Sequence, residues 1–408
     1  MGRLMNGPSR VLNIVQNLPV PFDRRVWLEC QALTAAGYDV TVICPRGPAD
    51  PRREVIEGVT LLKYRPYAPG GSALGFVVEY VYSFLATAWL VLRARRSGRF
   101  DVLQACNPPD IFWPIARALR WRDGTRFVFD HHDLCPELYE SRFPGGRELP
   151  HRGLLFLERA TFGTADHVIS TNESYASVAQ RRGGKRPGEV TVVRTGPDPA
   201  RLQRQRSISQ LRRGRRHLVA YIGVMGPQDG VDLALRAAAY IVHELRRDDV
   251  SFTFMGAGDC YHRLQELRDE LKLQDHLELP GRVPDAMVVD VLSTADVGLS
   301  PDPKNPLNDV STMNKTLEYM AFGIPVVAFD LHETRVSARD AALYVPDGDV
   351  PAYARAVLEL LDDDDRREEM GKIGRRRIEG ELGWPHQSEA YIRVYDALTD
   401  GRLSPGDA

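Results

Sequence analysis

Three titratable side chains stand in a row directly after an expected buried strand. The stretch "RFVFDHHDLCPELYE" (126–140) carries His131, His132 and Asp133. A carboxylate beside an imidazole can fix its tautomer and raise its basicity, which suits proton transfer. Loops that follow parallel strands are also where ligands bind in open α/β sheets. We therefore predict a catalytic site here in preference to structural histidines. We expect no metal, because we find no third ligand at suitable spacing.

A second group of polar side chains opens a helix in "STMNKTLEYMAFGIPVVAFD" (311–330). Ser311 or Thr312 is the expected N-cap, so free backbone amides at the helix start would face a ligand. Lys315 adds a point charge suited to phosphate, and Glu318 lies on the same side of the helix as Asn314. A carboxylate there can accept two neighbouring hydroxyls, as a ribose offers. An ordinary surface Lys–Glu pair is the alternative.

Three further loops follow predicted strands. Two are glycine-rich turns into helices, "YIGVMGPQDGVD" (221–232) and "FMGAGD" (254–259). Glycine lets a backbone approach a phosphate, and two such turns side by side could form a wall against a flat ring, although such turns also serve packing alone. In the third loop, Asn17, Arg24 and Arg25 precede a helix N-terminus, where anions are favoured. Ordinary surface arginines fit that loop equally well.

Parallel sheets are needed to hold these loops. A strand at 11–16, a helix at 26–36 and a strand at 39–45 form a strand–helix–strand unit, which implies parallel pairing. The pattern recurs through the first half of the chain and again in the second half. We therefore predict an α/β fold of two Rossmann-like, doubly wound parallel-sheet domains that face a cleft.

The order of these elements sets the expected domain boundaries. At 408 residues the chain suits two domains of about 200 residues each. The N-terminal domain should cover 1–200 and the C-terminal domain 217–384. The basic, turn-rich residues 201–216 lack apolar periodicity and are predicted to be a linker. The last segment, 385–408, is expected to be a helix that crosses back to the N-terminal domain, followed by a tail.

The amino-acid composition argues against several classes of protein. The formal net charge is -2, without the basic excess typical of nucleic-acid binders. The five cysteines are scattered and form no CxxC pair, so neither a disulfide framework nor a zinc site is indicated. The N-terminus shows no export signal. We expect a cytoplasmic protein that binds no nucleic acid.

One apolar segment, residues 74–92, approaches the length of a membrane span and is followed by basic residues. Glu79 within it, and the return to a buried-strand pattern at Phe100, favour a core or interdomain helix over a span. Contact of this helix with a membrane surface stays open, and with it peripheral association with the inner face of the plasma membrane.

Six motifs, in this order, resemble glycosyltransferase family 4, the retaining enzymes of the two-domain GT-B fold. They are "DRRVWLECQALTAAGYDVTVICP", "FDHHDLCPELYE", "TVVRTGPDP", "YIGVMGPQDGVD", "FMGAGD" and "NKTLEYMAFGIPVVAFD". The resemblance covers nearly the whole chain. It is closer to enzymes that build surface polysaccharides and lipid-linked glycans than to the starch and sucrose enzymes. It implies sugar transfer, with retention, from a UDP- or GDP-linked donor to an acceptor hydroxyl, without a metal or other cofactor.

The resemblance also implies roles for individual residues. His132 resembles the histidine near the transferred sugar and Glu318 the carboxylate that holds the donor ribose; with Asp133 they form the predicted catalytic set. The implied donor site comprises Gly226, Gln228, Gly256, Gly258, Val283, Asn314, Lys315 and Glu318. The implied acceptor site comprises Asn17, Arg24, Arg25 and His131. A glycan or lipid-linked acceptor would also suit the apolar helix over 74–92.

The chain departs from the family pattern at two places. Many members carry a second glutamate eight residues before the ribose glutamate, where this chain has Val310. Many also carry an arginine and a lysine in the phosphate turn, where Pro227 and Gln228 stand. Helix N-termini and other cations would then have to meet the diphosphate charge. Two alternatives stay open: a nucleotide-sugar 2-epimerase of the same fold, and a non-catalytic sugar-nucleotide-binding subunit.

Overall fold

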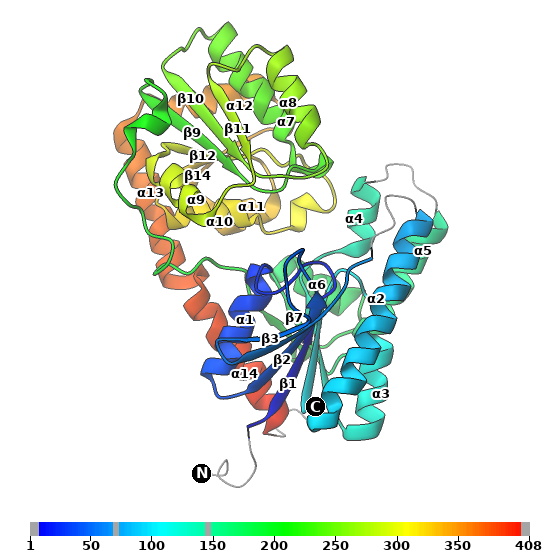
Figure 1. Cartoon of the computed structure of the whole chain (residues 1–408). Helices are drawn as coiled ribbons and strands as arrows, with labels where there is room; N and C mark the ends of the chain where they lie inside the picture. Colours follow the sequence, from blue (N-terminus) through cyan, green and yellow to red (C-terminus); the bar gives the residue numbers. More distant parts are fainter. Residues whose placement is uncertain (1–7, 68–72, 143–147, 401–408) are drawn as a thin grey trace. The chain divides into compact units, whose positions relative to one another are not determined.

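The computed structural model describes residues 8–67, 73–142 and 148–400 (Figure 1). Its contacts divide the chain into two compact units. The first unit comprises Met1–Arg194 and Gln387–Ala408, and the second comprises Thr195–His386. Each unit contains one β-sheet with its own helices.

The first unit is built on a sheet with the strand order β3-β4-β2-β1-β5-β6-β7-β8. All neighbouring strands pair in parallel except β3 and β4. The strand order reverses between β1 and β5, which is where a ligand crevice is expected at the carboxyl ends of the strands. The strands are β1 (Arg10–Ile14), β2 (Asp39–Pro45), β3 (Arg53–Ile56), β4 (Val59–Tyr64), β5 (Val102–Cys106), β6 (Arg126–His131), β7 (His167–Ser170) and β8 (Val190–Val192).

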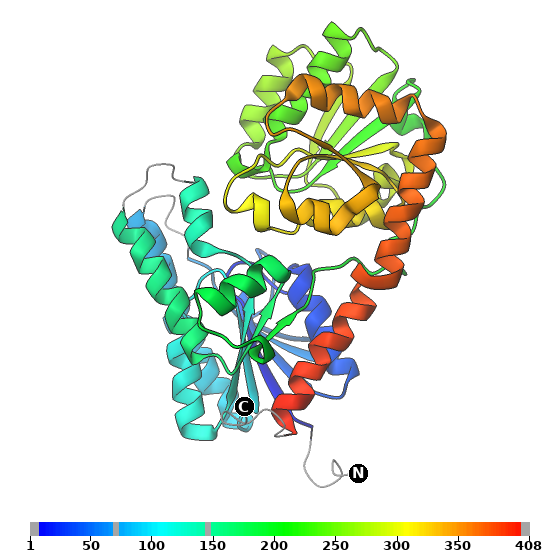
Figure 2. The ribbon, with the colours of Figure 1, turned by 180° about the vertical axis from the view of Figure 1, so that it is seen from behind.

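Helices cover both faces of this sheet (Figures 1 and 2). On one face lie α2 (Ala73–Ala94), α3 (Trp113–Asp123) and α5 (Glu148–Thr164); on the other lie α1 (Arg24–Ala35) and α14 (Trp384–Thr399). The short helices α4 (Cys135–Arg142) and α6 (Glu173–Arg181) follow β6 and β7. Helix α1 starts where it does because Asp23 caps it, accepting a hydrogen bond from the amide of Val26 at 3.1 Å.

The second unit has an all-parallel sheet in the order β11-β10-β9-β12-β13-β14, which reverses between β9 and β12. The strands are β9 (His217–Ile222), β10 (Val250–Met255), β11 (Leu277–Gly281), β12 (Val297–Ser300), β13 (Val326–Phe329) and β14 (Ala342–Val345). The helices are α7 (Val231–Ala239), α8 (Tyr261–Glu270), α9 (Asp285–Thr294), α10 (Asn314–Ala321), α11 (His332–Ala338), α12 (Val350–Leu361) and α13 (Asp364–Arg377). The two sheets confirm the predicted pair of parallel-sheet α/β domains.

The structure differs from the predicted linker at 201–216. The contacts place these residues in the second unit, where Arg212 pairs with Asp296 at 2.5 Å. The basic side chains that indicated a solvated linker instead bind carbonyls and a carboxylate next to β12. The chain passes into the second unit after residue 194 and returns to the first unit after residue 386.

Helix α2 has one face in the core of the first unit and one face in solvent. Leu90 and Val91 are buried in the hydrophobic core, and Gln16 donates to Glu79 Oε1 at 2.9 Å. By length and composition alone, Gly75–Ser97 could cross a membrane, and 22% of its most apolar window is buried. The structure therefore supports a core helix for one face and leaves the other face exposed.

Candidate active site

The histidine of the first unit's site lies just beyond the end of β6. Side chains alternate along a strand, so Asp130 and His132 point to one side of the sheet and His131 points to the other. Asp130 Oδ2 lies 3.1 Å from His132 Nδ1. The His132 side chain keeps 18% of its surface exposed, whereas the Asp130 carboxylate is fully buried. A buried carboxylate thus contacts one ring nitrogen of a partly exposed imidazole.

A neighbouring strand fixes the backbone of this loop. Asn107, directly after β5, accepts hydrogen bonds at its Oδ1 from the amides of His132 (2.9 Å) and Asp133 (3.0 Å). Its Nδ2 donates to the carbonyl of Asp133 at 2.7 Å. Three hydrogen bonds from one side chain therefore hold the loop in place before any substrate binds.

The surrounding charges favour a protonated His132. Burial opposes the imidazolium, but the charge and hydrogen bond of Asp130 outweigh it, so the pKa of His132 is raised above its ordinary value. Burial also opposes ionised Asp130, yet Arg25 and then His132 hold the pKa of that carboxyl well below its usual range. Arg25 donates to both carboxylate oxygens, at 2.7 and 3.1 Å. His132 can therefore hold or release a proton while Asp130 stays ionised.

The carboxylate that contacts the imidazole is Asp130, and not the predicted Asp133. Asp133 Oδ1 accepts a hydrogen bond from the amide of Leu134 at 2.9 Å, next to the start of α4. The sequence did indicate Asp130, because side chains alternate along the strand "FDHH" and so place Asp130 on the same side as His132. A catalytic role for Asp133 stays a prediction.

His131 lies on the opposite side of the sheet and is fully buried. Its ring centre is 5.0 Å from that of Phe162 and 5.4 Å from those of Phe129 and Tyr175. Burial, followed by the charge of Arg182, lowers its pKa to about 3. His131 is therefore a neutral core residue. This corrects its predicted contact with an acceptor, because neither ring nitrogen reaches the surface.

The other predicted acceptor residues fall into two groups. Asn17 and Arg24 are exposed, the first in the loop after β1 and the second at the start of α1, and their contact with an acceptor stays a prediction. Arg25 is buried and pairs with Glu29 at 3.1 Å as well as with Asp130. Its guanidinium therefore forms ion pairs in the interior of the unit.

One group of described residues has the geometry of a metal site. Ligand atoms of Cys106, Asp130 and His132 lie within 4.8 Å of one another. However, Arg25 already occupies both oxygens of Asp130 and brings a positive charge. Burial raises the pKa of the Cys106 thiol well above its ordinary value, while a metal would require the thiolate. This set of donors therefore fits a cation poorly.

In the second unit, glycines let the loops after β9 and β10 pack backbone against backbone. A Cβ on Gly256 would lie 1.9 Å from the carbonyl oxygen of Gly223, and a Cβ on Gly258 would lie 2.6 Å from that of Met225. The Met225 amide donates to the carbonyl of Ala257 at 3.0 Å. Close packing thus brings both loops together at the carboxyl edge of the sheet, where ligands bind in open α/β sheets.

The turn after β9 is also tied to the loop that precedes α10. Asn308 Nδ2 donates to the carbonyl of Gln228 at 2.9 Å. Gly230 has a φ of +63°, and a Cβ there would lie 2.0 Å from the carbonyl oxygen of Pro301. The loops after β9, β10 and β12 therefore form one connected region, the donor-side loops, which contains the predicted Gly226 and Gln228.

Lys315 is buried beside these donor-side loops. Its Nζ lies 2.5 Å from Asp302 Oδ1 and 5.5 Å from the centre of the Tyr221 ring. Asp302 in turn accepts a hydrogen bond from the Ser300 hydroxyl at 2.7 Å. A Cβ on Gly223 would lie 3.1 Å from Lys315 Cε, so the lysine stem runs along the turn after β9. Its charge is balanced by the buried carboxylate of Asp302, for which the sequence offers no local indication.

Helix α10 begins at Asn314, with Met313 at the N-cap and no side-chain hydrogen bond there. The predicted N-cap at Ser311 or Thr312 is therefore wrong; the Ser311 hydroxyl donates to a carbonyl of the preceding turn instead. Asn314 is exposed, and Glu318 one turn further is half-buried. Their contact with a nucleotide stays a prediction.

Val283 is the last residue of the predicted donor site, and Val310 marks a departure from the family pattern. Val283, at the start of the segment that leads into α9, is half-buried and packs against a hydrophobic core cluster of the second unit. Val310, which stands where many family members carry a glutamate, ends a short 3-10 turn (Asn308–Val310) ahead of α10. Contact of Val283 with a base stays a prediction.

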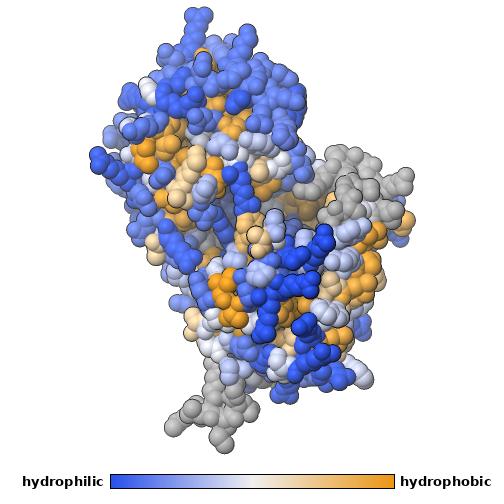
Figure 3. All heavy atoms as spheres, viewed as in Figure 1, coloured by the Kyte–Doolittle hydropathy of each residue, from blue (hydrophilic) through white to orange (hydrophobic). Residues whose placement is uncertain are grey.

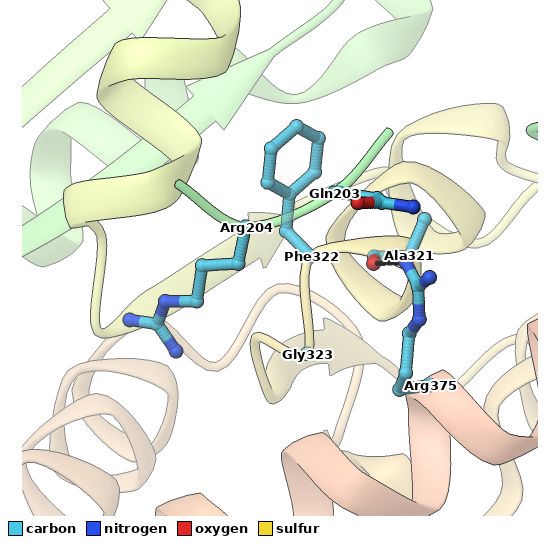
Figure 4. Close-up of a pocket in the computed structure, with 6 residues that line it drawn as sticks. All are labelled: Gln203, Arg204, Ala321, Phe322, Gly323 and Arg375. Atoms are coloured by element: carbon cyan, nitrogen blue, oxygen red, sulfur yellow. Dashed lines mark hydrogen bonds between the residues drawn. The ribbon is translucent and has the colours of Figure 1, made fainter. Parts of the chain in front are cut away.

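A separate cavity of about 400 Å³ lies at the other end of α10 (Figure 4). It is lined by Gln203, Arg204, Ala321, Phe322, Gly323 and Arg375. Ala321 is the last residue of α10, and Phe322 and Gly323 lead from it to β13, at the amino edge of the sheet. The cavity is therefore not part of the donor-side loops, which lie at the carboxyl edge.

Two α/β units of this topology, with polar residues at the carboxyl ends of their parallel strands, are typical of glycosyltransferases with the GT-B fold. Sequence profiles agree. The profile described as "Glycosyl transferases group 1" matches residues 216–363, and the one described as "Glycosyltransferase Family 4" matches residues 23–201. The chain belongs to glycosyltransferase family 4.

Two relatives illustrate the family. A GDP-mannose-dependent alpha-(1-6)-phosphatidylinositol monomannoside mannosyltransferase of Mycobacterium tuberculosis is 30% identical over 307 residues, which is 73% of this chain and 70% of the relative. A D-inositol 3-phosphate glycosyltransferase of Thermomonospora curvata is 27% identical over 334 residues, which is 76% of this chain and 75% of the relative.

Solved structures share the fold at low sequence identity. A sucrose-phosphate synthase from Thermosynechococcus elongatus has a TM-score of 0.79 at 18% identity and covers 96% of this chain and 100% of its own. HepE from Anabaena in complex with UDP-glucose has a TM-score of 0.70 at 14% identity and covers 95% and 99%. These likenesses show the fold shared by both units.

Proposed function

We propose that this glycosyltransferase moves a sugar, with retention, from a UDP- or GDP-linked donor to an acceptor hydroxyl in cell-surface polysaccharide or lipid-linked glycan synthesis. The observation that carries the proposal is the connected set of donor-side loops, with closely packed glycine turns and with Lys315 at the adjacent helix start. Diphosphates bind to such groups. The GDP-mannose dependence of one relative and the UDP-glucose complex of HepE support a nucleotide-linked donor.

In this proposal the second unit holds the donor. Backbone amides at the start of α10 would face the diphosphate beside the turn after β9, and Lys315 would add a positive charge. Glu318, on the same side of α10 as Asn314, would accept two ribose hydroxyls. The reaction then depends on preorganised charge that stabilises the departing diphosphate and an oxocarbenium-like sugar.

The first unit would supply the acceptor side. His132 has Nδ1 on Asp130, so Nε2 is the ring nitrogen that could meet a sugar or acceptor hydroxyl. The exposed Asn17 and Arg24 lie in the loop after β1 and at the start of α1, at the carboxyl edge of the same sheet. Because the names of the relatives place phosphatidylinositol mannoside and inositol phosphate among their acceptors, a phosphorylated or lipid-linked acceptor is the proposed class.

The test begins with a thermal-shift screen of the full chain against UDP- and GDP-sugars, each with EDTA present. The donor that raises Tm is then incubated with inositol 3-phosphate and with phosphatidylinositol mannoside. We expect nucleoside diphosphate release that requires an acceptor. Conversion of the donor alone into its epimer would favour the 2-epimerase, and donor binding without transfer would favour the non-catalytic subunit.

The exposed face of α2 supports a place of action at a membrane. Val77, Val81, Leu85, Trp89 and Leu92 are each more than half exposed and recur every three or four residues, so they form one stripe, the α2 stripe. Figure 3 shows apolar side chains gathered over this side of the first unit. A continuous exposed apolar stripe of this kind is typical of an interaction surface.

The residues at the end of the stripe suit an anionic lipid surface. The guanidinium of Arg93 lies 5.6 Å from the centre of the Trp89 ring, and Arg96 and Arg99 are exposed after it. Tryptophan and arginine together are typical of helices at a membrane interface. The opposite face, with Leu90, is fixed in the core of the unit, which argues against a membrane span.

We therefore propose that the enzyme is cytoplasmic and binds the inner face of the plasma membrane through the α2 stripe. Sedimentation with phosphatidylglycerol-containing vesicles tests this. The double variant Leu85→Gln/Trp89→Gln should lose binding by about tenfold or more, whereas the control Val55→Gln, which removes an equally exposed side chain from β3, should bind like wild type. Equal sedimentation of all three, or sedimentation of none, would contradict it.

A further inference from the structure

A chain of buried polar side chains runs from His132 through the first unit to α14. It starts at Asp130, the carboxylate that contacts the imidazole, and ends at two tyrosine hydroxyls. Its members are Arg25, Glu29, Gln104, Asp130, Tyr391 and Tyr395, here called the Asp130 network. Each member is buried.

Arg25 is the centre of the Asp130 network. Its guanidinium binds both oxygens of Asp130, at 2.7 and 3.1 Å, and lies 3.1 Å from Glu29 Oε1. It also donates to the carbonyl of Val193 at 3.0 Å. A planar guanidinium with several fixed partners holds Asp130 in one orientation, and Asp130 in turn sets the orientation of the His132 ring.

Glu29 connects this centre to α14. Its Oε2 accepts a hydrogen bond from Gln104 Nε2 at 2.7 Å. Tyr395 donates to Gln104 Oε1, and the Tyr391 hydroxyl lies 2.8 Å from the same oxygen and 3.0 Å from the Tyr395 hydroxyl. The network therefore reaches the last helix of the chain.

Both segments that connect the two units touch this network or its neighbours. Val193, bound by Arg25, stands two residues before the chain enters the second unit. The amide of Arg194 donates to Gln387 Oε1 at 2.9 Å, and Gln387 is the first residue after the chain returns. Tyr391 follows one turn later on α14. The residues that orient His132 are thus anchored at the two crossing points of the chain.

The charges of the network leave one proton to be shared. With Arg25 charged and Asp130 ionised, a second carboxylate at Glu29 gives one excess negative charge. Burial, and then the charge of Asp130, raise the pKa of Glu29 to about 8, while the pKa of His132 is raised as well. Asp23, in the loop before α1, adds to the field at His132. Either a neutral Glu29 or a charged His132 balances the network, so the two sites titrate together.

We propose that Arg25 and Glu29 are positioning residues for His132. Arg25 fixes the Asp130 carboxylate that orients the imidazole, and Glu29 competes with the imidazole for one proton. This inference rests on the proposed function, in which His132 meets the sugar or the acceptor. It also gives Arg25 a role inside the unit in place of the predicted acceptor contact.

The desolvation energy that it costs to bury the network favours a functional role over a purely structural one. Burying two carboxylates, an arginine and a glutamine costs desolvation energy that pairing rarely exceeds, and apolar residues of similar volume often stabilise a core as well or better. A stability role alone therefore explains the network poorly. Control of the orientation and charge of a partly exposed imidazole explains why it connects to His132.

The test is an NMR titration of the imidazole resonances of the full chain, with His132 assigned by its loss in His132→Gln. Glu29→Gln keeps the size and hydrogen-bonding capacity but removes the charge. We expect it to lower the pKa of His132 by at least about half a pH unit, and to shift the pH profile of kcat in the same direction. An unchanged titration would overturn the proposal, and this result does not depend on finding the substrates.

A second variant covers the case in which Glu29→Gln does not fold. Arg25→Lys keeps the charge but loses the two-point grip on Asp130, and we expect kcat to fall about tenfold or more while KM for the donor stays unchanged. Arg95→Lys is the matched control, because Arg95 grips Asp123 through two contacts of 2.5 Å elsewhere in the unit. Equal kcat in Arg25→Lys and Arg95→Lys would overturn the proposal.

Discussion

Replacement of Lys315 by methionine should affect stability and donor binding separately. The lysine and Asp302 side chains are 8% and 2% exposed and lie 2.5 Å apart, so Lys315→Met leaves an unpaired carboxylate in the interior. Breaking a buried pair in this way costs about 3–5 kcal/mol. For a domain of this size that corresponds to a fall in Tm of about 6 °C or more. Lys304→Met breaks an exposed pair with Asp309 and should cost about 0–1 kcal/mol.

The double variant Lys315→Met/Asp302→Leu separates the two effects. It removes both charges of the pair, so most of the lost stability should return. Donor binding should not return, because the positive charge beside the donor-side loops is still missing. Calorimetry of the full chain with the donor found by thermal shift should give a Kd weaker than wild type by about tenfold, or 1.4 kcal/mol, in both the single and the double variant.

Two results would contradict the two roles of Lys315 in stability and in donor binding. Wild-type donor affinity in the stable double variant would show that Lys315 serves the fold and not the diphosphate. A single variant Lys315→Met as stable as Lys304→Met would show that the ion pair with Asp302 contributes little. Donor affinity tests the role of Lys315 in binding, and stability tests its ion pair with Asp302. Either role can therefore be excluded without excluding the other.

Three further predictions concern the remaining sites. In His131→Phe, activity should be unchanged; because the pKa of His131 is lowered to about 3, wild type should lose stability as the pH falls below about 6.5, and the variant should lose less, as Tm at pH 7.5 and pH 5 will show. In Gly256→Ala, the new Cβ would strike the carbonyl of Gly223, so Kd for the donor should rise about tenfold or more, whereas Gly163→Ala, in open space on α5, should bind donor normally. Transfer activity should persist in EDTA, because the donor site is predicted to bind diphosphate through amides and Lys315.

Each of these predictions has a clear contrary outcome. Loss of activity in His131→Phe would restore a role for that ring in the reaction. Normal donor binding by Gly256→Ala would separate the loops after β9 and β10 from the donor. Abolition of activity by EDTA, with recovery on addition of a divalent cation, would show that a metal takes part and would direct attention to Cys106 and its neighbours.

The sequence predicted those parts of the fold that depend on local pattern. Alternating strands and helices with short loops imply parallel sheets, and glycines at strand ends mark places where two backbones meet, as at Gly256 and Gly223. A basic, aperiodic stretch was less informative. Residues 201–216 bind the second unit through arginine side chains, and composition alone does not distinguish that from a solvated linker.

Contacts between distant residues set the limits of prediction at the site. The partner of His132 could have been read from strand alternation. However, Arg25 meets Asp130 across 105 positions of the sequence, and no local pattern indicates that pairing. The sequence likewise suggested a Lys315 charge available to a phosphate, whereas in the structure Lys315 forms an ion pair with Asp302. Hydropathy identified α2 as apolar but could not show which of its faces the core would cover.

Sugar transfer with retention from a nucleotide-linked donor is the proposed reaction. The most direct test is an NMR measurement of the one-bond C1–H1 coupling of the transferred sugar, using the full chain, a ¹³C-labelled form of the donor selected by thermal shift and the acceptor that supports turnover. We expect the same anomeric configuration in the product as in the donor. An inverted configuration, or labelled sugar found only as an epimerised nucleotide, would contradict it.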